Sequence, residues 1–294
     1  MNPSSNLFRG ISFKNQTTRK IARMVYRKIK EIKLELRIIR IAPIIREMQN
    51  SPDFPASDAS PTQHLELTLR GNNETIALLN QLAQASSLRV RMIEEIMTGS
   101  TLENNLKDLF DKNGSDKGKE HEYYPIYSRV FEKSVDPLHI LEIGIGSKNK
   151  KIPSNMGKYG SPGASLKAFR EIRSQNTIYG ADIDEDTLNL ETDLIYIHLD
   201  QTSDKSWEDL VSKVPNNSLD LLIDDGLHSP IANLRTLIYG TKLLKPGGTI
   251  VIEDIAEKAL PVWSLLSHFS QDIYRIELFK CKKSHAIVLE SKHL

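Results

Sequence analysis

The stretch Leu141-Glu142-Ile143-Gly144-Ile145-Gly146 decides the fold of this chain. It ends a short apolar run, residues 138–143, which carries an acidic residue near its end and leads into a Gly-x-Gly turn. Glycine allows positive φ values and a close approach of the backbone, which a parallel strand needs where it meets a nucleotide-like ligand. The stretch therefore predicts a strand of an α/β sheet with a ligand site at its carboxyl end.

Apolar runs alternate with helical segments from residue 100 onward. The predicted strands are residues 138–143, 177–182, 194–199, 219–223 and 249–253, and the predicted helices are residues 165–174, 206–214 and 229–244. This alternation predicts an α/β fold with a doubly wound, Rossmann-like parallel sheet. Two further runs, 274–280 and 286–289, flank a polar turn and predict a C-terminal antiparallel hairpin.

The part of the chain before this sheet divides into segments of different composition. Residues 1–49 have apolar side chains at helical spacing among many cations, which predicts a basic amphipathic helical arm. Residues 50–62 are rich in Pro, Ser and Asp and predict a linker. Residues 63–108 predict a helical auxiliary region, whose apolar stripe runs over 75–97. The main domain is then expected to span residues 109–294.

Charge is distributed unevenly between these segments. Residues 1–47 hold twelve Lys/Arg against three Asp/Glu, a net charge of +9, and the remainder holds 27 against 35, a net charge of −8. The arm is consistent with a solvated helix of a homo-oligomer or with peripheral membrane contact through residues 17–47, and both alternatives stay open. Tyr26 is the only aromatic residue in the helical stretch, which argues against stacked single-stranded nucleic acid.

Cysteine usage and hydropathy indicate the compartment. The single cysteine, Cys281, excludes an internal disulfide framework and a multi-cysteine metal site. A reducing, cytoplasmic location is therefore expected, with membrane association through the arm as the alternative. No stretch has the length of an apolar membrane span, and the N-terminus lacks an uninterrupted apolar signal core.

Acidic residues end three successive predicted strands. Ligands in open α/β sheets bind beyond the carboxyl ends of the strands, where Glu142, Asp182 and Asp200 lie. Asp182 could accept hydrogen bonds from both hydroxyls of a ribose, with Asp184 as the competing candidate, and Asp200 could meet an adenine edge. No third glycine stands at Asn149, so the dinucleotide fingerprint is incomplete and the pattern favours S-adenosylmethionine (SAM) over a nicotinamide cofactor. The alternative role for each aspartate is a helix cap.

The fourth and fifth strands end in residues suited to metal-assisted chemistry. If these strands are neighbours, Asp225, Glu253 and Asp254 converge, since adjacent strands lie about 5 Å apart. Converging carboxylates repel one another, and a hard divalent cation such as Mg²⁺ neutralises them. His228, three residues past Asp225, is better suited to act as a general base on a hydroxyl. The alternative is that the acids cap helices and His228 is an ordinary loop histidine.

Residues from about 110 to 289 resemble a class I SAM-dependent methyltransferase. Within that superfamily they are similar to the metal-dependent macrolide-sugar O-methyltransferases of the macrocin and mycinamicin type and to the related cephalosporin-hydroxylase-like group. The motifs that carry this resemblance are Gly114-Ser115-Asp116-Lys117-Gly118 with His121 and Tyr124, Leu141-Glu142-Ile143-Gly144-Ile145-Gly146, Gly163-Ala164-Ser165-Leu166, Asp200-Gln201-Thr202, Asp224-Asp225-Gly226-Leu227-His228 and Glu253-Asp254.

The resemblance implies roles for individual residues. Asp225, Glu253 and Asp254 would hold the metal, and His228 would be the catalytic base, acting together with Asp225. The residues implied in cofactor binding are Glu142, Gly144, Gly146, Ser165, Asp182, Asp200, Gln201 and Asp224. The segment 114–118 and Tyr124 would lie over the mouth of the cofactor or substrate site.

The sequence thus predicts a SAM-dependent, Mg²⁺-assisted O-methyltransferase acting on a sugar hydroxyl. The expected acceptor is a glycan, a glycolipid or a glycosylated natural product, and a catechol-type acceptor stays open. The alternatives are a nicotinamide-dependent oxidoreductase on a similar sheet and a catalytically silent module that docks to a membrane or an assembly. The long polar loop 147–162 is expected to be a lid or substrate loop, because loops of this length in compact domains often are.

Overall fold

The computed structural model describes residues 28, 88–152, 154–157, 160–190 and 193–292. Apart from Lys28, these residues belong to the second of two units, Leu79–Leu294. The predicted basic arm (Lys28 excepted), the linker and residues 63–87 lie outside the described residues, so the predictions made for them stay predictions. None of the helices that the structure describes has both the length and the apolar content to cross a membrane.

The described residues form one eight-stranded sheet with the strand order β1-β7-β8-β6-β5-β2-β3-β4. Strands β2 to β6 run parallel to one another, and β8 is antiparallel to both β6 and β7. The strands are β1 (Val90–Met92), β2 (His139–Ile143), β3 (Thr177–Asp182), β4 (Ile195–His198), β5 (Leu219–Asp224), β6 (Leu244–Ile255), β7 (Tyr274–Lys280) and β8 (His285–Ser291). The predicted parallel sheet with a C-terminal antiparallel hairpin is confirmed.

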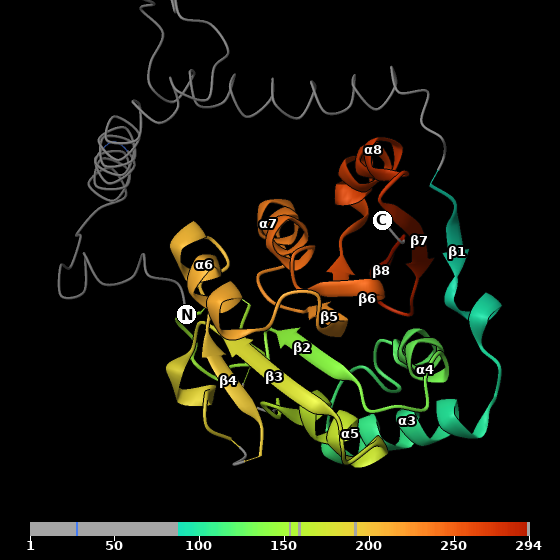
Figure 1. Cartoon of the computed structure of the whole chain (residues 1–294), viewed down its shortest axis with the longest axis horizontal. Helices are drawn as coiled ribbons and strands as arrows, with labels where there is room; N and C mark the ends of the chain where they lie inside the picture. Colours follow the sequence, from blue (N-terminus) through green and yellow to red (C-terminus); the bar gives the residue numbers. More distant parts are fainter. Residues whose placement is uncertain (1–27, 29–87, 153, 158–159, 191–192, 293–294) are drawn as a thin grey trace, which may run out of the picture. The chain divides into compact units, whose positions relative to one another are not determined.

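Helices cover both faces of this sheet (Figure 1). One layer consists of α3 (Thr101–Asn113), α4 (Tyr124–Glu132) and α5 (Ala164–Ile172), and the other of α6 (Asp204–Lys213), α7 (Pro230–Gly240) and α8 (Leu260–Ser270). Rings of Phe110, Tyr127 and Phe169 pack edge to face in the first layer. Trp207 and Trp263 are buried in the second layer. The sheet therefore has two separate apolar cores, one on each face.

Alternation along each strand decides which core a side chain enters. In β2, Ile140 packs in the core of α3, α4 and α5, whereas Leu141 packs in the core of α6, α7 and α8. Successive side chains of a strand point to opposite faces, so Glu142 shares the face of Ile140. By the same rule, Asp224 at the end of β5 shares the face of Leu222 rather than that of Ile223. This parity determines which strand-end acids meet.

The start of the described unit differs from its predicted helix. Residues 75–97 were expected to be helical, but Val90–Met92 forms strand β1, and Ile93–Ile96 forms a 3-10 helix. β1 pairs in parallel with β7, and the Arg91 guanidinium makes an ion pair with the carboxylate of Glu277. The prediction was wrong here because an open sheet edge offers backbone partners that helical periodicity does not reveal. The predicted domain boundary at 108/109 falls inside α3.

Candidate active site

A cavity of about 250 Å³ lies at the carboxyl ends of β2, β3, β4 and β5. The sequence-predicted cofactor residues that line it are Gly144, Gly146, Asp182, Asp200 and Gln201. Asp225, Gly226 and Leu227 line the cavity from the β5 side, and Ile152 and Ser154 line it from the predicted loop 147–162. The cavity therefore occupies the position that the strand-end residues predicted.

The two glycines after β2 allow the neighbouring loops to pack tightly at this edge of the sheet. Gly144 has a φ of 81°, and a Cβ atom there would lie 2.1 Å from the carbonyl oxygen of Asp225. Gly146 has a φ of 95°, and a Cβ atom there would lie 2.2 Å from Cε of Met156. Since contacts this short do not occur, a side chain at either position would displace the β5 loop or the loop over the cavity. The Gly-x-Gly motif thus lets the turn after β2 pack closely against the β5 loop and the loop over the cavity.

Asp182 lies at the cavity, whereas the competing Asp184 does not line it. The Asp182 carboxylate is buried and accepts hydrogen bonds from the backbone N–H of Gly146 at 3.2 Å and of Asp184 at 2.9 Å. Burial raises the pKa of Asp182, although these N–H donors oppose the shift. Asp184 instead caps the 3-10 helix Glu185–Thr187, so its carboxylate is used locally. The geometry favours Asp182 as the ligand-facing acid.

Asp224 is held inside the protein by uncharged donors. Its Oδ1 accepts from Gln201 Nε2 at 2.8 Å, and its Oδ2 accepts from Thr236 Oγ1 at 2.6 Å and Asn233 Nδ2 at 3.0 Å. The Oε1 atom of Gln201 in turn accepts from the backbone N–H of Leu227 at 2.7 Å. Asp224 is fully buried and does not line the cavity, which departs from the expectation that it contacts a cofactor. The network fixes the loop that follows β5.

Glu142 and Ser165 form a buried pair beside the cavity. Ser165 Oγ, at the start of α5, donates to Glu142 Oε2 at 2.6 Å, and neither residue lines the cavity. The other carboxylate oxygen of Glu142 lies 3.3 Å from Nζ of Lys117. Burial raises the pKa of the Glu142 carboxyl. Both residues were predicted to contact the cofactor, and in this structure their polar atoms face the protein interior.

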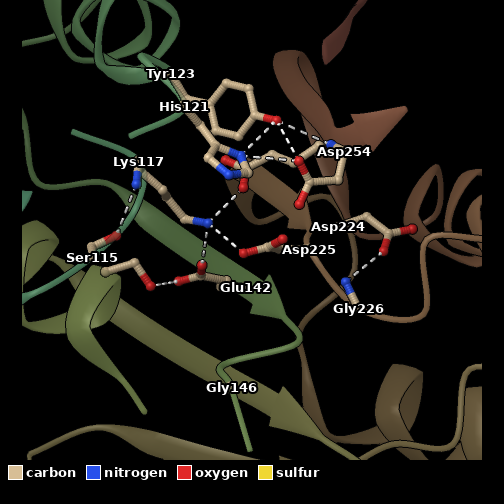
Figure 2. A network of polar contacts seen from close by, with 12 residues as sticks. Ser115, Lys117, His121, Tyr123, Glu142, Gly146, Asp224, Asp225, Gly226 and Asp254 are labelled. Atoms are coloured by element: carbon tan, nitrogen blue, oxygen red, sulfur yellow. Dashed lines mark hydrogen bonds and ion pairs between the residues drawn. The ribbon is translucent and has the colours of Figure 1, made fainter. Parts of the chain in front are cut away.

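Lys117 lies in the segment 114–118, which was expected over the mouth of the site together with Tyr124, but neither of these two residues lines the cavity. Figure 2 shows the Lys117 ammonium among the strand-end acids instead. Lys117 Nζ lies 2.6 Å from Asp225 Oδ2 and 2.6 Å from Glu253 Oε2, and its side chain is 1% exposed. Burial alone would lower the pKa of this ammonium, but the charges of Asp225 and Glu253 outweigh burial and raise the pKa well above its ordinary value. Lys117 therefore carries its charge into the protein interior, where a lone charge would be very costly.

Asp254 is oriented by a second set of donors. Its Oδ1 accepts hydrogen bonds from Tyr123 Oη at 2.8 Å and Ser284 Oγ at 2.9 Å, and it lies 3.0 Å from His121 Nδ1. Burial alone would raise the pKa of Asp254, but the hydrogen bond from His121 holds it well below its ordinary range. Asp254 also has a φ of 54°, so its backbone leaves the extended conformation of β6. The carboxylate is thereby turned out of the strict alternation of the strand.

Asp225, His228 and Asp254 come together at the ends of β5 and β6. Each offers one ligand atom, and these atoms all lie within 4.8 Å of one another. Two partly exposed carboxylates in this arrangement suit a hard divalent cation completed by water. His228 Nε2 is 3.9 Å from Asp254 Oδ2. The residues present therefore fit a divalent metal.

Glu253, predicted as a third metal ligand, is not in that group. Its Oε2 is bonded to Lys117 Nζ, and its Oε1 accepts from the hydroxyl of Tyr127. Burial raises the pKa of Glu253 well above its usual value, although Lys117 opposes the shift. Its side chain is 1% exposed, compared with 25% for its neighbour Asp254. The backbone explains the difference, since the left-handed φ of Asp254 turns its carboxylate away from the direction that strand alternation would give it.

Comparisons with known proteins agree with this architecture. No family model matches the chain. It is 27% identical over 159 residues to the 8-demethyl-8-alpha-L-rhamnosyl tetracenomycin-C 2'-O-methyltransferase of Streptomyces olivaceus, a match that covers 54% of this chain and 39% of that protein.

Solved structures of MycE, a methyltransferase from the mycinamycin biosynthetic pathway, are also similar. The complex with Mg, SAH and mycinamycin VI has a TM-score of 0.52 and 23% identity, covering 64% of this chain and 55% of that one. A complex with Mg and SAH has a TM-score of 0.51 at the same identity and coverage. The chain thus spans little more than half of the MycE chain. These likenesses confirm that the described unit has the α/β, Rossmann-like fold of methyltransferases, as its motifs predicted.

Proposed function

We propose that this chain is a SAM-dependent O-methyltransferase that uses a divalent cation and acts on a sugar hydroxyl of a glycosylated natural product. The observation that carries the proposal is the meeting of Asp225, His228 and Asp254 beside a cavity at the carboxyl edge of a parallel sheet. The rhamnosyl 2'-O-methyltransferase from Streptomyces olivaceus supports the acceptor class. The MycE complexes with Mg and SAH support the cofactor and the metal.

The cavity supplies the proposed cofactor site. Asp182 is the acid proposed to accept from the ribose hydroxyls, and Asp200 is proposed to meet the adenine, since both line the cavity at the ends of β3 and β4. Gly144 and Gly146 keep the floor free of side chains. SAM carries a sulfonium cation, so an acidic cavity complements it better than it complements a pyrophosphate. Gln201 lines the same cavity and shapes it through the β5 loop.

Asp225 and Asp254 are the proposed metal ligands, and His228 is the proposed base. A bound divalent cation supplies Lewis-acid chemistry and neutralises the excess negative charge of the site. The imidazole of His228 is 29% exposed, and its Nε2 lies 3.9 Å from Asp254 Oδ2, so it is accessible to take a proton from an acceptor hydroxyl. The remaining contribution of the chain is alignment of the acceptor with the methyl donor.

The test is methyl transfer by the full chain from SAM with a labelled methyl group. Acceptors would be rhamnosides and other glycosides of polyketide aglycones, with a catechol and an aglycone lacking sugar as comparison acceptors. We expect labelled glycoside and SAH to form with MgCl₂ present, and to be absent in EDTA. Asp204→Asn, at an exposed residue of α6, is the control variant and should keep full activity. Transfer to no glycoside, or full transfer in EDTA, would contradict the proposal.

A further inference from the structure

Four acidic side chains gather at the end of the sheet, and three of them contact one buried ammonium. Glu142, Asp225, Glu253 and Asp254 come from the ends of β2, β5 and β6, and Lys117 Nζ contacts the first three of them. Asp254 is paired with His121, whose Nδ1 lies 3.0 Å from Asp254 Oδ1. Lys117 therefore holds the other three carboxyl groups together at one point.

The backbone around Lys117 is fixed, which leaves its ammonium little freedom. The carbonyl oxygen of Lys117 accepts hydrogen bonds from the backbone N–H groups of Tyr123 at 3.0 Å and Tyr124 at 3.2 Å. A Cβ atom at Gly118 would lie 2.3 Å from the carboxylate of Asp111, so the loop is pressed against α3. The backbone of Lys117 is therefore fixed, and its ammonium can shift only through the torsions of its own side chain.

The three partners of Lys117 differ in exposure. Glu142 and Glu253 have side chains only 1% exposed, whereas the Asp225 side chain is 20% exposed. Asp225 is also the one of the three that belongs to the Asp225–His228–Asp254 group. It is thus shared between an internal cation and the position proposed for a divalent cation. Two cations on one carboxylate repel each other, and this repulsion is weakly screened in a buried site.

We infer that Lys117 is a resident counter-ion which competes with the divalent cation for Asp225 and thereby weakens metal binding. This inference rests on the proposed function, because it takes Asp225 and Asp254 as the metal ligands. When a metal binds, the ammonium gives up Asp225 and stays with Glu253 and Glu142, which are the more buried partners. When the metal is absent, Lys117 holds the acids in place, so the metal-free protein keeps its fold.

The first experiment measures metal affinity rather than activity. MnCl₂ is titrated by calorimetry into the metal-stripped full chain, as wild type, Lys117→Met and Lys112→Met. Lys112 is the matched control, because it is a lysine 65% exposed and paired with Glu171 away from the site. We expect Lys117→Met to bind Mn²⁺ at least about tenfold more tightly than wild type, and Lys112→Met to stay within about threefold. Equal or weaker binding by folded Lys117→Met would overturn the inference.

A second measurement uses the wild type and does not depend on the folding of a variant. In a crystal structure with MnCl₂, we expect the Lys117 Nζ to Asp225 Oδ2 distance, 2.6 Å in the metal-free chain, to exceed about 4 Å while the Glu253 contact remains. A metal on Asp225 with the lysine contact unchanged would overturn the inference, as would a metal bound elsewhere.

The two proposals fail in different experiments. If Lys117→Met binds Mn²⁺ more tightly than wild type but the wild type methylates no glycoside, the counter-ion inference is supported and the proposed function is contradicted. If the wild type methylates glycosides but Lys117→Met gains no Mn²⁺ affinity, the proposed function is supported and the counter-ion inference is contradicted.

Discussion

Asp224 and Asp225 are neighbours at the end of β5, yet they lie in two different polar networks. Asp224 accepts from uncharged groups, which are the amides of Gln201 and Asn233, the hydroxyl of Thr236 and the backbone N–H of Gly226. Asp225 contacts the ammonium of Lys117 and stays partly exposed at the cavity. A carboxylate that is surrounded by neutral donors and closed off from solvent stabilises the fold. A carboxylate that lies close to a second acid and has access to solvent is available to bind a cation.

Replacing Asp225 should have the largest effect on activity and a small effect on folding. Asp225→Ala removes a proposed metal ligand, so we expect methyl transfer to fall by at least about 10³-fold. The free energy of unfolding should change by less than about 1 kcal/mol, because Lys117 keeps Glu253 and Glu142 as partners. Steady-state kinetics and urea unfolding measure the two quantities. A folded Asp225→Ala variant with near wild-type turnover would contradict the role of Asp225 as a metal ligand.

His228→Ala should lower kcat by roughly 10²- to 10⁴-fold, the range usual for loss of a general base. Binding of SAH and of Mn²⁺ should remain within a fewfold of wild type, since the proposed metal carboxylates and the cavity lining are untouched. Calorimetry with each ligand, alongside kinetics, separates a base from a metal ligand. Loss of Mn²⁺ binding in His228→Ala would show that the imidazole coordinates the metal instead.

Asp224→Ala should show the opposite pattern to Asp225→Ala. It leaves buried donors of Gln201, Asn233 and Thr236 without an acceptor, so we expect the free energy of unfolding to fall by about 2–4 kcal/mol. Mn²⁺ affinity of the folded fraction should change little, because Asp224 lies outside the metal group. Urea unfolding and calorimetry on the same preparation provide the measurement. A stable Asp224→Ala variant would contradict the structural role assigned to this network.

The smallest expected effect concerns a buried neutral group, His285, at the start of β8. Burial lowers the pKa of His285, so the unfolded chain takes up a proton before the folded chain does. The stability that neutral His285 contributes is therefore present above about pH 6.5 and is lost as pH falls from there toward the lowered folded pKa. This loss should be absent in His285→Gln, which has no group that titrates in this range. Unfolding free energies between about pH 5 and 8 test this, and an identical pH dependence in the variant would refute it.

The sheet could be predicted because its signals are local. Each core strand from β2 to β6 overlaps a predicted apolar run, and helices follow most of them at the expected places. The strand-end acids followed from topology alone, since parallel strands of one sheet end at the same edge. The short strand β1 was missed because its pairing with β7 joins residues far apart in the chain. Helix α8 was also missed, since no motif marks it.

The site was predicted less completely than the sheet. Asp225 and Asp254 meet as expected, but Glu253 is bonded to Lys117 and Tyr127 instead. Asp224, expected at the cofactor, is enclosed by Gln201 and residues of α7. Lys117 belongs to the motif Gly114-Ser115-Asp116-Lys117-Gly118. Its position between the two glycines of that motif, shortly before the aromatic-rich helix α4, was the available signal. Nothing in the sequence shows that it would reach a carboxylate 108 positions away.

Periodicity and glycine conformation are properties of short segments, so the succession of strands along the chain, the glycine turn and the types of side chain at each strand end could be predicted from the sequence. Which of those side chains face one another depends on how the strands and loops pack. The parity of β5 separates Asp224 from Asp225, and the left-handed φ of Asp254 turns its carboxylate toward Asp225 and His228. Long-range packing then brings the ammonium of Lys117 among the acids. The burial of this lysine joins residues far apart in the chain, so it arises only in the folded protein.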